Sequence, residues 1–184
     1  LKTPGKTGRA GGARAYDYGH IVEVTVQPDG AANAVRHYAL GRMSAELAEV
    51  LPDERTAYIS DDGRDAALFM FVADRPRDLS AGTLYAARWE QVAASRGGKA
   101  NLRWVRLGHA TDAEIHALVD QGIAFSDIFE TIDAGSYRDK PGLARAFRPV
   151  YVFAGPGAGF KGRLEFLKLR PGREQAAAFL ESRR

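Results

Sequence analysis

Short stretches of alternating apolar and polar residues dominate the first 107 positions of the chain. In residues 21–26 (IVEVTV) the valines fall on one face of an extended strand, and Pro28-Asp29-Gly30 is typical of a turn that leads into a returning strand at 35–40. Four further stretches have the length and composition of strands: 55–60, 68–72, 83–89 and 102–107.

The stretch 44–51 (SAELAEVL) has a mixed pattern, since its residues favour a helix while its neighbours on both sides favour strands. Pro52-Asp53-Glu54 interrupts it, so we predict a β-hairpin with the strand 55–60. The continuous apolar run 68–72 (LFMFV) predicts a strand buried on both faces. About seven strands with a turn signal roughly every 8 to 15 residues indicate an antiparallel sandwich, barrel or propeller.

The pattern changes after Gly108. Residues 111–121 predict a helix that begins at the N-cap Thr111, with Glu114 placed to complete a capping box. We also expect helices at 125–132 and 173–182. The sequence thus predicts three parts, which are a flexible segment 1–18, an antiparallel β region 19–107, and an irregular, partly helical insertion 108–184 within the same domain.

Composition narrows the function classes. The 184 residues are 45% apolar and 27% charged, as in a soluble globular protein, and no apolar run approaches the roughly 18 residues of a membrane span. The absence of cysteine excludes disulfides, cysteine–zinc sites and thiol catalysis within these residues. Because the chain begins with Leu1 and ends within a predicted helix, we expect it to be an internal portion of a longer protein.

Charge is unevenly distributed along the chain. Residues 1–14 carry four basic groups and no acid, residues 15–134 carry 11 basic and 19 acidic groups, and residues 135–184 carry 11 basic and 4 acidic groups. The basic end also contains several aromatic side chains, a combination that binds nucleic acid in other proteins. Basic residues that cover an acidic neighbour give the same pattern, and no nucleic-acid module is recognisable, so we do not favour nucleic-acid binding.

The predicted hairpin brings acidic residues together. Folding about Asp53 places Glu46 opposite Asp61, with Asp62 one step further, and cross-strand Cβ atoms lie about 5 Å apart. Carboxylates this close share a proton, spread into water or bind a cation, and oxygen-rich groups suit Ca²⁺, Mg²⁺ or iron. A solvated polar turn at Asp61-Asp62-Gly63 explains the same residues without a ligand.

One further motif, Gly157 to Gly162 (GAGFKG), has the spacing of a dinucleotide-binding turn. A nucleotide-binding βαβ unit needs about 30 residues, and only 22 follow Gly162, so we favour a surface loop. The four histidines show no metal-binding spacing, and we interpret them as ordinary strand or loop residues.

A set of short motifs between Tyr18 and Gly108 occurs in an order and spacing that resembles the PhoX-type alkaline phosphatases, a bacterial family with a β-propeller fold. The motifs are YGHIVE (18–23), ALGRMSAE (39–46), YISDDG (58–63), LFMFV (68–72), TLYAARW (83–89) and WVRLG (104–108). The resemblance implies that residues 19–107 form about two antiparallel propeller blades, whose partners are the remaining blades of the full-length chain.

The same resemblance implies hydrolysis of small phosphate monoesters in the periplasm or outside the cell, with calcium and iron ions as cofactors. Family metal ligands fall on Glu46 and on Asp62, or on Asp61 if the hairpin register shifts by one residue. The chain has Ala45 where the family motif has histidine. A calcium-binding propeller protein without catalysis is therefore the alternative, and no residue is assigned as a nucleophile.

Overall fold

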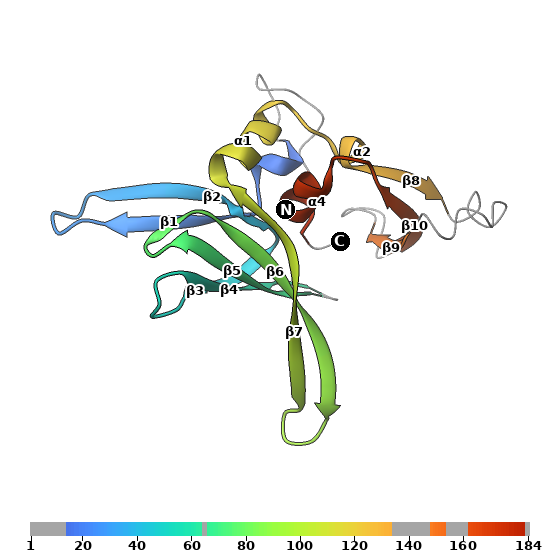
Figure 1. Ribbon diagram of the computed structural model, residues 1–184, viewed down its shortest axis with the longest axis horizontal. Helices are drawn as coiled ribbons and strands as arrows, with labels where there is room; N and C mark the ends of the chain where they lie inside the picture. Colours follow the sequence, from blue (N-terminus) through green and yellow to red (C-terminus); the bar gives the residue numbers. More distant parts are fainter. Residues whose placement is uncertain (1–13, 64–65, 134–147, 154–161, 183–184) are drawn as a thin grey trace.

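The computed structural model describes residues 14–63, 66–133, 148–153 and 162–182, and these fold mainly into antiparallel β-sheet. A five-stranded sheet has the order β3-β4-β5-β6-β7, a two-stranded sheet pairs β1 with β2, and a three-stranded sheet has the order β8-β10-β9 (Figure 1). The strands are β1 (His20–Val26), β2 (Ala32–Arg42), β3 (Ala45–Val50), β4 (Thr56–Asp61), β5 (Leu68–Arg75), β6 (Asp78–Ala93), β7 (Lys99–Thr111), β8 (Phe129–Asp133), β9 (Arg148–Phe153) and β10 (Gly162–Leu169).

All seven strands predicted before residue 108 are present, and each is joined to the next in the antiparallel sense within its sheet. The hairpin interpretation of 44–51 is confirmed. Its turn is held by Asp53, whose carboxylate accepts hydrogen bonds from the backbone N–H of Arg55 at 3.0 Å and of Thr56 at 2.9 Å. The mainly antiparallel β class is therefore confirmed, and the sheets are consistent with a portion of a propeller.

The hydrophobic core lies on one face of the five-stranded sheet. Phe69 and Phe71 of β5 are fully buried there, together with Ile59 of β4. The helices α1 (Asp112–Asp120) and α4 (Glu174–Leu180) and the second half of β2 supply the opposing layer (Figure 1). The prediction that 68–72 is buried on both faces was wrong, because the residues that alternate with Phe69 and Phe71 remain partly exposed.

The region after Gly108 contains more strand than we predicted. The helix at 111–121 is confirmed as α1, with both hydrogen bonds of the capping box between Thr111 and Glu114. The expected helix 125–132 is wrong beyond its first turn, since only α2 (Phe125–Ile128) is helical and β8 follows it. Pairing with β10 accounts for the difference, because a tertiary β-ladder overrides a weak local helix preference. The helix expected at 173–182 appears as α4.

Three sequence features lie wholly or partly outside the described residues: the segment 1–13, most of the glycine motif 157–162, and several of the basic residues of the C-terminal part. Within the part of the chain that the structure describes, no helix has the length and apolar character needed to cross a bilayer.

Candidate metal site at the β3–β4 hairpin

The open end of the β3–β4 hairpin carries the three predicted carboxylates. Ala45, and not Glu46, is the Cα partner of Asp61, and the register shifts before Leu47 pairs with Ser60. Glu46 is thus the extra residue of a β-bulge, so that two residues of β3 oppose Asp61. The predicted pairing of Glu46 with Asp61 was wrong by one position, because the prediction assumed a regular ladder and the bulge shifts the register by one residue.

Asp61 is a buried acidic residue with only 6% of its surface exposed. It follows Ala57 and Ile59 on the core side of β4, and its Oδ1 accepts a hydrogen bond from the backbone N–H of Ser44 at 2.9 Å. The N–H of Asp62 donates to the carbonyl of Ser44 at 2.8 Å, which closes this end of the hairpin. Burial of a carboxylate is costly unless hydrogen bonds or a cation compensate, so Asp61 is held in a defined position.

Glu46 and Asp62 are exposed, in contrast to Asp61. The three side chains supply only carboxylate oxygens, which are the donors that calcium prefers and that iron also accepts. Among the described residues, no group of three or more histidine, aspartate or glutamate side chains is arranged to hold a metal ion. The donor chemistry therefore fits a hard cation, while the described residues alone supply at most part of a ligand set.

A second polar centre, which the sequence pattern did not predict, surrounds His37. The imidazole is buried, and its Nδ1 lies 2.8 Å from Asp112 Oδ2 while its Nε2 lies 2.8 Å from Glu23 Oε2. Burial alone would lower the pKa of His37, but the hydrogen bonds to Asp112 and Glu23 outweigh it, and the pKa is raised. No local spacing signals this group, because Asp112 is 75 positions away in the chain.

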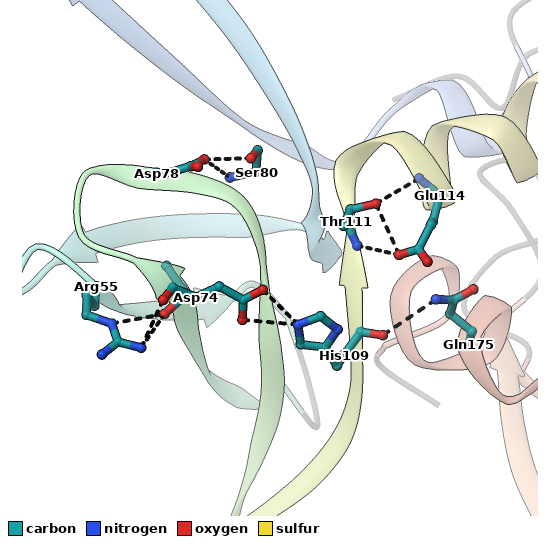
Figure 2. Close-up of polar contacts among 9 residues, drawn as sticks. Arg55, Asp74, Asp78, Ser80, His109, Thr111, Glu114 and Gln175 are labelled. Carbon is teal, nitrogen blue, oxygen red and sulfur yellow. Dashed lines mark hydrogen bonds and ion pairs between the residues drawn. The ribbon is translucent and has the colours of Figure 1, made fainter.

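A third group, shown in Figure 2, joins Asp74 of β5 to His109 of β7 across the intervening strand β6. The His109 Nε2 lies 3.0 Å from both carboxylate oxygens of Asp74. Asp74 lies where the β5–β6 register shifts, and Gly82 of β6 pairs with the residue before it. Arg55 donates to the carbonyl oxygens of Ala73 and Asp74 (Figure 2). The side chains of Asp74 and His109 are both well exposed, so their ion pair is a surface contact between strands.

The match with known proteins comes from a family model. The model for alkaline phosphatase PhoX matches residues 5–178, which is most of the chain. No curated protein and no solved structure is similar enough to this chain to count as a match. Since the family model covers far more than half of the sequence, the chain belongs to the PhoX family of alkaline phosphatases.

Proposed function

We propose that this chain is part of a metal-dependent phosphatase that hydrolyses small phosphate monoesters. Family membership supports the reaction class. The observation that carries the proposal is the carboxylate of Asp61, which is buried, oriented by the N–H of Ser44 and faced by the bulge that contains Glu46. A carboxylate fixed in this way is ready to accept a cation without further ordering of its side chain.

In this proposal Glu46, Asp61 and Asp62 are ligands to calcium or iron ions, and other parts of the protein complete the ligand set. A bound cation would supply charge neutralisation at the phosphate oxygens during phosphoryl transfer. The contribution of this chain is to orient carboxylate oxygens. Ser44 fixes the carboxylate of Asp61, and its carbonyl holds the backbone at Asp62. We also propose that further propeller blades complete the fold and that the protein is exported to the periplasm or the medium.

The test is phosphate release from a chromogenic monoester by the full-length protein. We expect Glu46→Ala and Asp62→Ala to lower both bound metal and kcat/KM, the latter by at least about 10-fold, since removing even an indirect partner of a metal ligand costs this much. Glu49→Gln is the matched control, because Glu49 lies on the same exposed strand. Full activity together with full metal content in both alanine variants would contradict the proposal.

A calcium-binding protein without catalysis is the second candidate, and the residue that favours it is Ala45. It is the Cα partner of Asp61, so this position offers a methyl group where the family motif has an imidazole. In that case, a chelator lowers the melting temperature of the full-length protein, and no monoester is hydrolysed before or after metal is restored. Turnover that depends on added metal excludes this candidate.

A further inference from the structure

We propose that His37 acts as a pH-dependent latch that fastens the β1–β2 hairpin to the body of the protein, closed while the imidazole is doubly protonated and open once it loses a proton. The hairpin extends away from the helices in Figure 1. We call the outer part of this hairpin, residues 21–36, the arm.

His37 lies at the base of the arm. The first five residues of β2, Ala32 to Arg36, are exposed, and the next five are buried, beginning with His37. On β1 the side chains of Val22, Val24 and Val26 are 52%, 57% and 67% exposed. A two-stranded hairpin is marginally stable by itself in water, so the contacts at its base determine how firmly the arm is held.

The two hydrogen bonds of His37 require both ring protons. Each ring nitrogen lies 2.8 Å from a carboxylate oxygen, and an ionised carboxylate only accepts hydrogen bonds. Neutral imidazole has one N–H and can therefore satisfy only one of the two carboxylates. Loss of the second proton leaves a nitrogen lone pair against a carboxylate oxygen, which is repulsive.

The two carboxylates come from different elements. Glu23 lies on β1, within the arm, whereas Asp112 is the first residue of α1 and also accepts a hydrogen bond from the N–H of Ala39 at 2.7 Å. The imidazolium thus joins the arm to a helix that packs on the core. Glu23 is the more exposed partner, with 48% of its side-chain surface accessible against 19% for Asp112, so we expect opening to begin on the Glu23 side.

Besides Glu23 and Asp112, one acidic group among the described residues interacts with the charge of His37, and the neighbouring Arg36 donates a hydrogen bond to the hydroxyl of Tyr38. The pKa of Asp78, at the start of β6, is lowered. The hydrogen bonds from Ser80 lower it most, and the charge of His37 makes the smallest contribution. On the other elements near β2, Glu181 after α4 accepts from Tyr16, His109 on β7 pairs with Asp74, Glu114 of α1 caps Thr111, and His116 of α1 pairs with Asp120.

The pH dependence has a defined sign. The pKa of His37 is raised above the value of 6.5 for an unperturbed histidine. The latch is therefore fully closed below about pH 6.5, and its contribution is lost as the pH rises through the raised pKa. At a pH above this raised pKa, the arm is held only by its β-ladder and by packing.

The test is a titration of the histidine ring nitrogens by NMR in full-length protein, with His37→Gln to assign the signal. We expect two protonated ring nitrogens below pH 6.5 and a pKa above that value. Glu23→Gln and Asp112→Asn should each lower the pKa, by about 1 unit or more, because each removes an adjacent opposite charge. Glu49→Gln removes the same charge from an exposed strand and should leave the pKa unchanged.

Hydrogen exchange of the arm amides, corrected for the intrinsic pH effect, provides the second readout. We expect protection in residues 21–26 and 32–36 to fall at least tenfold across the His37 titration and to be independent of pH in His37→Gln. Glu23→Gln keeps the test valid if Asp112→Asn fails to fold, since Glu23 is half exposed. A single protonated nitrogen, a pKa at or below 6.5, or arm protection that does not change with pH would each overturn the proposal.

Discussion

At the scale of single residues, His20 and His37 show how environment sets charge. Both lie in the first hairpin, yet burial lowers the pKa of His20 to about 4, a shift that its hydrogen bond to the carbonyl of Tyr16 does not offset. The ring of His20 packs against Tyr38 at 4.4 Å, without an acidic partner among its described contacts. His20 is therefore neutral in the folded protein at pH 7, whereas the pKa of His37 is raised by its two carboxylate partners.

We predict that His20 makes the fold sensitive to acid. Its pKa is about 4 when folded and 6.5 when unfolded, so the unfolded state binds the proton first and stability falls as the pH drops from about 6.5 toward 4. The difference corresponds to roughly 3 kcal/mol. The free energy of unfolding should fall less between pH 7 and pH 4.5 in His20→Gln than in the natural sequence, and equal losses would contradict this assignment.

Gly82 is another residue whose identity is fixed by its surroundings. A Cβ at this position would lie 2.4 Å from the carbonyl oxygen of Val72 and 2.5 Å from the ring of Phe71. We expect Gly82→Ala to destabilise the protein by about 1–3 kcal/mol, as overpacking does. Gly108→Ala is the comparison, because its nearest contact is the side chain of Phe179 at 3.0 Å. Thermal unfolding should show the larger loss for Gly82→Ala, and the reverse order would contradict the prediction.

At the scale of elements, the junction at Thr111 turns a strand into a helix. Thr111 is the last residue of β7 and the N-cap of α1, and its hydroxyl accepts a hydrogen bond from the N–H of Glu114. The carboxylate of Glu114 accepts one in return from the N–H of Thr111 at 2.7 Å. This junction places Asp112 beside His37, so a local capping motif positions a long-range contact.

Removal of the cap should cost stability. We expect Thr111→Ala to lower the free energy of unfolding by about 1 kcal/mol, the typical value for loss of an N-cap hydroxyl. Thr111→Ser keeps the hydroxyl and is the matched control. Chemical denaturation measures both, and an alanine variant as stable as the serine variant would show that the capping box contributes nothing here.

Elements fixed by local signals could be predicted from the sequence, while those fixed by distant partners could not. The turn at Asp53 and the cap at Thr111 involve residues three positions apart, and both were predicted in the right place. The strand β8 depends on pairing with β10, so its residues gave a wrong helix prediction. The carboxylates of the hairpin were found from the family resemblance and the strand pattern, but the bulge at Glu46 has no signal in either.

At the scale of the whole molecule, the five-stranded sheet ends in an exposed strand. In the described part of the chain β3 is an edge strand, all six of its residues are exposed, and Leu47 is 56% exposed. An exposed apolar edge pairs readily with other strands. The sheet therefore offers a site for a further strand, as expected for one portion of a propeller.

We predict that this edge makes the 184-residue chain self-associate when it is produced alone. Leu47→Lys should reduce the association measured by light scattering, because a charge on an edge strand opposes pairing with another strand. Gln27→Lys adds the same charge at an exposed position outside the strands and should have little effect. Equal association of the natural chain and Leu47→Lys would show that the β3 edge is not responsible.

The proposed metal site is tested most directly by Asp61→Asn in the full-length protein. The amide oxygen of asparagine can still accept the hydrogen bond from Ser44, so the substitution removes the negative charge and keeps the local structure. We predict that bound metal decreases and that kcat/KM for a chromogenic phosphate monoester falls at least about 10-fold, while Glu49→Gln retains both. An Asp61→Asn protein with full metal content and full activity would contradict the assignment of this carboxylate as a ligand.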